Sequence, residues 1–125
     1  MAHHTEKNPQ PLPEQPPDKG LIYVIGNGSM LGAAIQARLT MDGKRVGVNR
    51  VSNYFYREAG PGPHIFARTP MVAACLAWSS KKGITYFLQQ KLTMGGTNLD
   101  LIDAEKGKKY AAKYHRRTFQ ERHKN

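Results

Sequence analysis

The feature that most restricts the fold of this chain is an apolar run of strand length that ends in a glycine-rich turn. Leu21 to Ile25 are all apolar or aromatic, and Gly26 and Gly28 follow directly. Beyond the turn, apolar side chains recur at helical spacing, at positions 31, 35 and 39. Asp42-Gly43 then suits the end of a helix, and Val46–Val48 suits a second strand. Residues 20–50 therefore predict a strand, a glycine turn, a helix and a second strand, which is a βαβ unit.

Glycines at such a turn allow an anion to approach the backbone. Gly26 permits a tight turn, and Gly28 has no Cβ to keep a phosphate away from the main-chain N–H groups at a helix N-terminus. The residues predicted to contact the phosphates of a dinucleotide are Gly26, Asn27, Gly28, Ser29 and Met30.

The end of the second predicted strand indicates which dinucleotide would bind. An acidic residue there would bond the ribose 2′-hydroxyl of NAD, whereas an arginine accommodates the 2′-phosphate of NADP. This chain has Arg50 at that position, with Ser52 close by. The sequence therefore predicts NADP as the cofactor.

The second half of the chain predicts the same order of elements, a strand, a helix and a strand. His64–Ala67 reads as a short strand, Thr69 and Pro70 suit the cap and first position of a helix through Trp78, and Ile84–Leu88 reads as another strand. Two strand-helix-strand units predict a parallel sheet covered by helices. Between them, the aromatic trio Tyr54–Tyr56 favours the edge of a core over stacking on a nucleotide base.

With these motifs, Gly20 to Gln90 resembles the NAD(P)-binding Rossmann family. The pattern is closest to the cofactor domain of ketopantoate reductase and 6-phosphogluconate dehydrogenase-like proteins, through the glycine turn, Ile65–Arg68 and Lys82–Gln90. The resemblance implies NADP as ligand, with Arg68 among its contacts. Those enzymes carry their catalytic residues on a further helical domain, and only about 35 residues follow Gln90 here. A reductase would need a partner chain, or His64 as its general acid or base.

The predicted fold class is therefore α/β, a small Rossmann-like parallel sheet with flanking helices at residues 20–92. Residues 1–19 hold five of the eight prolines and predict an extended tail without a fold of its own. Residues 93–125 predict a linker and a basic C-terminal helix or arm.

The excess of positive charge is concentrated near the C-terminus. The chain has a formal net charge of +10, and residues 104–125 hold eight Lys and Arg against two Glu. Tyr110 and Tyr114 lie one helical turn apart within this segment. Cations interleaved with aromatic rings predict contact with RNA or an acidic partner, and a solvated terminal helix is the alternative. The residues predicted to make that contact are Lys106, Lys108, Lys109, Lys113, Arg116, Arg117 and Arg122.

The single cysteine, Cys75, excludes an intrachain disulfide, so a reducing intracellular compartment and a buried structural thiol are expected. No Cys/His cluster has zinc spacing, so no metal is expected. No import signal is readable, although a mitochondrial location is compatible with the predicted assemblies. Residues 20–37 carry no charge, yet their glycines and polar side chains make a poor membrane span.

Together these features predict a non-catalytic, Rossmann-like, NADP-binding accessory subunit of a larger assembly, attached through its two tails. Three alternatives remain open: an RNA-contacting ribonucleoprotein subunit such as a ribosomal one, an NADP-dependent reductase completed by a partner chain, and a single-span accessory subunit of a respiratory membrane complex.

Overall fold

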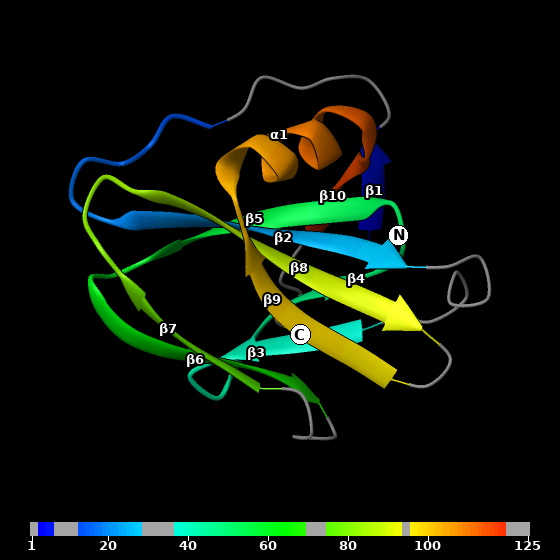
Figure 1. The fold of residues 1–125 in the computed structure, drawn as a ribbon, viewed down its shortest axis with the longest axis horizontal. Helices are drawn as coiled ribbons and strands as arrows, with labels where there is room; N and C mark the ends of the chain where they lie inside the picture. Colours follow the sequence, from blue (N-terminus) through cyan, green and yellow to red (C-terminus); the bar gives the residue numbers. More distant parts are fainter. Residues whose placement is uncertain (1–2, 7–12, 29–36, 70–74, 94–95, 120–125) are drawn as a thin grey trace.

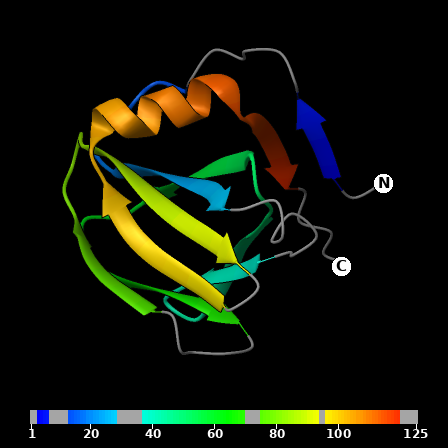
Figure 2. The same cartoon turned by 45° about the vertical axis from the view of Figure 1, so that its right-hand side comes forward.

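Two β-sheets lie face to face, and one helix covers the outer surface of the larger sheet (Figures 1 and 2). The computed structural model describes residues 3–6, 13–28, 37–69, 75–93 and 96–119. In spatial order, the larger sheet consists of β1 (His3–Glu6), β10 (His115–Phe119), β5 (Asn53–Ala59), β2 (Gly20–Gly28), β8 (Thr85–Thr93) and β9 (Gly96–Ile102). The smaller sheet consists of β4 (Lys44–Asn49), β3 (Ala37–Met41), β6 (Gly62–Thr69) and β7 (Cys75–Ser80). The helix is α1 (Ala104–Lys113).

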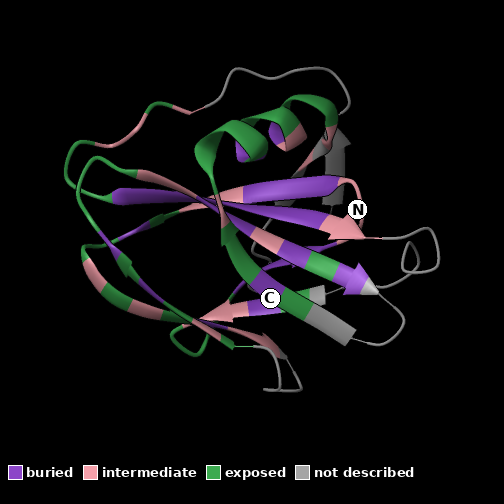
Figure 3. Cartoon of the chain, in the orientation of Figure 1, coloured by how far each residue is buried: buried purple, intermediate pink, exposed green. Residues whose placement is uncertain are grey.

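The apolar run Leu21–Ile25 lies in β2, near the centre of the larger sheet. Because side chains of a strand alternate between its faces, Ile22 and Val24 enter the core between the two sheets, whereas Tyr23 and Ile25 enter a second core beneath α1. All of these residues are at most 2% exposed. β2 is thus buried on both faces, which explains why it lacks the polar alternation of a half-exposed strand (Figure 3).

The predicted α/β class is wrong, because the described residues form a two-sheet sandwich with the short helix α1. β2 continues in extended form through Gly28, and Leu39, expected in a helix, lies in β3. The predicted helix through Trp78 is also wrong where it is described, since Cys75–Ser80 is β7. The other parts of both predicted helices, residues 29–36 and 70–74, lie outside the described residues.

The pairing of strands differs from a Rossmann sheet as well. β2 and β8 are parallel neighbours, as are β10 and β5, but every other pairing is antiparallel. β4, expected beside β2, instead pairs antiparallel with β3 in the opposite sheet. An apolar strand of a sandwich and one of a parallel sheet have the same local pattern, so periodicity could not separate them.

Asp42-Gly43 forms a hairpin turn rather than the end of a helix. Met41 pairs with Lys44, so the loop between β3 and β4 has two residues. Both have positive φ, 55° at Asp42 and 85° at Gly43, as a type I′ turn requires. An Asp-Gly pair between two strands is a strong hairpin signal, and it was available in the sequence.

Several expected elements are confirmed. The predicted strands at 46–48, 64–67 and 84–88 lie within or overlap β4, β6 and β8. The aromatic trio Tyr54–Tyr56 is part of the core, as predicted. Phe55 faces the smaller sheet, and Tyr54 and Tyr56 pack beneath α1.

The basic C-terminal helix is confirmed for Ala104–Lys113. Asp103 caps its N-terminus, since its carboxylate accepts a hydrogen bond of 2.8 Å from the Lys106 backbone N–H. Gly107 and Ala111 are buried against the sheet. After the helix, β10 pairs with β5 and with β1, so parts of both expected tails join the larger sheet.

Cys75 is exposed on β7, so the prediction of a buried thiol is wrong. No helix among the described residues is long and apolar enough to cross a membrane, and residues 20–28 of the uncharged stretch form β2.

Candidate functional site

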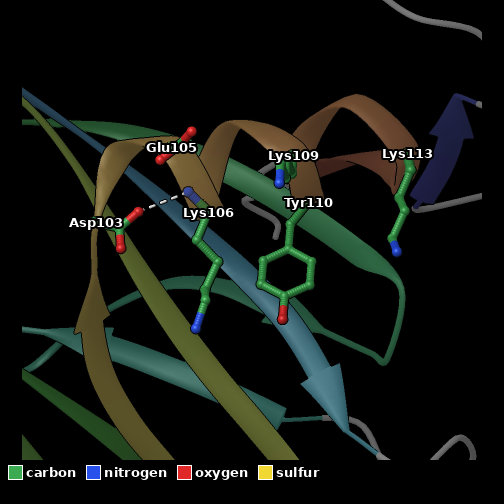
Figure 4. A pocket seen from close by; sticks show the side chains of 6 residues that line it. All are labelled: Asp103, Glu105, Lys106, Lys109, Tyr110 and Lys113. Carbon is green, nitrogen blue, oxygen red and sulfur yellow. Dashed lines mark hydrogen bonds between the residues drawn. The ribbon is translucent and has the colours of Figure 1, made fainter.

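A shallow depression lies along one side of α1, with a volume of about 360 Å³. We call it the α1 groove. Figure 4 shows that Lys106, Tyr110 and Lys113 extend from the same side of the helix. The residues that line it are Asp103, Glu105, Lys106, Lys109, Tyr110 and Lys113. Three of these six side chains are cationic, and they follow one another along the helix.

Helical spacing produces this row of lysines. Gly107 and Ala111 define the buried stripe, and positions 106, 109 and 113 fall together on one flank of it at spacings of three and four residues. The row extends about 10 Å along the axis, from a rise of about 1.5 Å per residue. Lys108 lies on the other flank, where it is exposed.

Tyr110 is held in place beside the lysines by the larger sheet. The Asn27 side-chain amide donates hydrogen bonds to the Tyr110 hydroxyl (2.9 Å) and to Gln89 Oε1 (3.0 Å). The Tyr114 hydroxyl donates to Asn27 Oδ1 (3.0 Å), and its ring stacks on Tyr110 with centroids 5.3 Å apart. Burial and the neighbouring Tyr110 raise the pKa of Tyr114, which favours the neutral hydroxyl that donates to Asn27.

Among the described residues, no ion pair involves the lysines of α1. Ion pairs there join Lys19 to Glu58 and His64 to Asp42. Asp103 lines the groove, but its Oδ1 accepts the Lys106 backbone N–H at the N-cap. The groove is therefore an open surface with three lysines, two carboxylates near its N-terminal end and one fixed aromatic ring.

The other predicted cationic contacts are distributed differently. The Arg116 guanidinium lies 5.3 Å from the centre of the Tyr56 ring, and its Nε donates to the Tyr54 hydroxyl at 3.4 Å. Arg117 lies in β10, and Arg122 lies outside the described residues.

The residues predicted to bind NADP are placed at the ends of strands. Gly26 lies within β2, where a Cβ would collide with the Arg50 carbonyl, and Gly28 has φ 149° beside the Leu92 backbone. Their lack of a side chain thus permits close backbone approach within the fold. Ser52 donates its backbone N–H to the Gly26 carbonyl (2.9 Å). Ser29 and Met30 lie outside the described residues.

The expectation of NADP rested on a βαβ unit, and the sandwich removes that basis. The structure nevertheless brings Gly26, Arg50 and Ser52 together at one end of the sandwich, and Arg68 lies near that end on β6. Asn27 contributes instead to the network beneath α1.

At the same end lies a group that we call the strand-end cluster, made of Asn49, Arg50, Arg68 and Gln90. Asn49 and Gln90 are completely buried. The Asn49 side-chain amide donates to the Val24 carbonyl (3.2 Å) and to Gln90 Oε1 (3.1 Å), so it connects β4 of one sheet with β2 and β8 of the other.

His64, the expected acid or base of a reductase, serves a structural role. Its Nδ1 lies 2.6 Å from the Asp42 carboxylate and its Nε2 lies 2.7 Å from the Gly60 carbonyl. Both partners are acceptors, so this geometry favours the doubly protonated ring, and both nitrogens are engaged in hydrogen bonds. Asp42 and His64 are 22 residues apart, so no local signal predicts their contact. Among the described residues, no group of three or more His, Cys, Asp or Glu is arranged to hold a metal.

Comparison with known proteins gives one relative. The chain is 29% identical over 104 residues to an uncharacterized protein of Haemophilus influenzae, in an alignment that covers 78% of this chain and 61% of that protein. The chain thus spans about three fifths of that relative's length. No family model matches the chain, and no solved structure matches it significantly.

Proposed function

We propose that the protein is a non-catalytic binding module that holds single-stranded RNA in the α1 groove. The observation that carries the proposal is the row of Lys106, Lys109 and Lys113 beside the fixed ring of Tyr110. Cations that neutralise phosphates supply the sequence-independent part of nucleic-acid affinity, and an aromatic ring adds stacking with a base.

RNA fits these groups better than an acidic protein does. An acidic peptide needs only cations, whereas the groove combines a linear row of cations with an aromatic ring whose position is held by Asn27 and Tyr114. A preformed ring loses little conformational freedom when a base stacks on it. Attachment of this module to a larger ribonucleoprotein assembly remains a prediction from the sequence.

Fluorescence anisotropy with a labelled uridine dodecamer tests the proposal. The logarithm of the binding constant of the unchanged protein should fall linearly with the logarithm of the NaCl concentration. Each contact with single-stranded nucleic acid contributes about 0.7 to that slope, so the variant K106Q/K109Q/K113Q should lower its magnitude by about 2. The matched control K44Q/K81Q/K82Q removes the same charge from three exposed lysines of the β4 strand and the β7–β8 turn, and should leave the slope unchanged.

Tyr110 provides a second comparison at the same site. Tyr110→Phe keeps the ring and should keep the affinity, whereas Tyr110→Leu removes stacking and should weaken binding about tenfold. Equal losses in the two lysine triples would refute the α1 groove as the RNA site. Binding of polyglutamate without binding of the uridine dodecamer would refute RNA in favour of an acidic protein partner.

A further inference from the structure

We infer that the strand-end cluster binds a small oxyanion, carried by a phosphate or a carboxylate group, between the two sheets. This site is distinct from the α1 groove, because it faces the inside of the sandwich. Its basis is a set of buried hydrogen-bond donors, Arg50 Nε, Arg68 Nε and Gln90 Nε2, that have no acceptor among the described residues.

Strand directions bring these three residues to one end of the molecule. β2 and β8 are parallel, so both C-terminal ends lie together, and Gln90 is the register partner of Gly26. Asn49 contacts Val24 and Gln90, which places the end of β4 there as well. β4 and β6 are each antiparallel to β3, so β6 also ends at this side.

The donors of Gln90 and Arg68 face the space between the sheets. Arg68 is paired with Leu39 and lies two residues after Phe66, and both of those side chains are in the core between the sheets. Gln90 is completely buried and lies two residues after Leu88, which belongs to the same core. Arg50 directly follows β4, and its backbone carbonyl lies against Gly26.

The orientation of the Gln90 amide is determined by its neighbours. Asn49 Oδ1 accepts the Arg50 backbone N–H at 3.2 Å, and Asn49 Nδ2 donates to the Val24 carbonyl, so the Asn49 amide cannot be flipped without losing both bonds. Asn49 Nδ2 therefore presents a donor to Gln90, and Gln90 must present its oxygen. Gln90 Nε2 is left as a donor directed away from Asn49.

An anion is the ligand that this set of groups requires. Buried donors are almost always paired, yet Gln90 Nε2 and the Nε atoms of the partly buried Arg50 and Arg68 have no acceptor among the described residues. The described residues supply no carboxylate in an ion pair with Arg50 or Arg68. An oxyanion accepts several hydrogen bonds at once and neutralises the guanidinium charge. Phosphate and carboxylate groups share this chemistry, and separate titrations with phosphate and acetate distinguish them.

The test is thermal unfolding followed by the fluorescence of Trp78, with sodium phosphate or sodium acetate compared with NaCl at equal ionic strength. The midpoint should rise and saturate with one of these anions. Arg68→Met and Gln90→Leu should each weaken the apparent affinity by at least about tenfold, through loss of a charge-assisted or buried hydrogen bond. Arg38→Met, on the exposed face of neighbouring β3, is the matched control and should keep the full response. The triple K106Q/K109Q/K113Q should keep it too, which separates this site from the proposed RNA site.

Gln90→Glu keeps the test informative if the other variants fold poorly. It places a carboxylate oxygen where the unpaired amide nitrogen stands, so it supplies the anion from within the chain. The variant should unfold at a higher temperature than the unchanged protein without added anion, and should lose the anion response. A response to phosphate alone assigns a phosphate-bearing ligand, and a response to acetate alone a carboxylate-bearing one. No response to either anion, an unchanged response in Arg68→Met, or a destabilised Gln90→Glu would overturn the inference.

Discussion

Replacement of Gly107 by alanine tests how closely α1 lies on the larger sheet, and two effects of known size oppose each other. Alanine in place of glycine within a helix favours folding by about 1 kcal/mol. Against this, a Cβ at Gly107 would lie 2.7 Å from the Phe87 Cβ and nearer still to two of its ring carbons. Carbon atoms need about 3.5 to 4 Å, so the helix must rise by about 1 Å.

Phe87 cannot move aside to relieve this contact. Its side chain is 2% exposed, and its ring lies 4.9 Å from the ring of Tyr23. Overpacking of this kind costs about 1–3 kcal/mol. With about 2 kcal/mol for the clash and about 1 kcal/mol for helix propensity, Gly107→Ala should lower the free energy of unfolding by about 1 kcal/mol and the melting temperature by about 4 °C.

Urea unfolding followed by Trp78 fluorescence measures this change, since Trp78 is the one tryptophan and is buried. Ala112→Gly, at an exposed position of the same helix, isolates the propensity effect and should cost about 1 kcal/mol. In a double-mutant cycle, Phe87→Leu should show a favourable coupling with Gly107→Ala of about 1 kcal/mol. If Gly107→Ala stabilises the protein as propensity alone predicts, the close contact between α1 and β8 does not exist.

Three further predictions concern local contacts. Burial of the His64 ring opposes its protonation, but its hydrogen bonds to Gly60 and Asp42 outweigh this and raise the pKa of His64, while the His64 and Ile65 hydrogen bonds lower the pKa of Asp42. The contribution of His64 to the free energy of unfolding is therefore complete below about pH 6.5, and it is lost as pH rises through the higher pKa of His64 in the folded protein. The contribution of Asp42 is complete above about pH 4 and is lost in more acidic solution. The Asp42 side chain is 46% exposed, so solvent screens its contact with His64. We therefore expect the free energy of unfolding to fall by only about 1 kcal/mol between pH 6 and pH 9. Urea titrations of His64→Gln should lack this decrease. Asp103→Ala removes the N-cap of α1 and should cost about 1 kcal/mol in the same assay, whereas Asp103→Asn, which keeps a capping oxygen, should cost much less. Gly43→Ala meets no neighbouring atom but forces alanine to φ 85°, so we expect a loss of about 1 kcal/mol from backbone strain alone, and no loss would contradict the type I′ turn.

The sequence was informative where the signal was local. The apolar runs predicted the buried parts of β2, β4 and β8, and the aromatic trio was correctly assigned to the core. The interleaved lysines and tyrosines predicted a basic C-terminal helix or arm within residues 93–125, and residues 104–113 of it form α1. Its capping residue, Asp103, is also of a type that favours a helix start.

The two predicted helices failed where they are described because short apolar segments suit either structure. Leu39 and Trp78 are buried in both readings, but β3 and β7 acquire their extended form through pairing with β6. The pairing of β3 with β6 joins residues 25 to 31 positions apart, and that of β7 with β6 joins residues 8 to 18 positions apart, beyond the few residues that a local pattern records.

The two candidate sites also differ in how far local sequence determines them. The sequence by itself determined the cations and rings of the α1 groove, because helical periodicity places Lys106, Lys109, Tyr110 and Lys113 on one flank whatever the rest of the chain does. Only the tertiary structure decided that Tyr110 is fixed by Asn27. It also decided that Gln90 of the larger sheet and Arg68 of the smaller sheet lie at the same end of the sandwich, each directed toward the opposite sheet. The physical reason is that a helix brings neighbours in sequence together through its own hydrogen bonds, whereas a sandwich brings together strand ends whose positions depend on every intervening pairing.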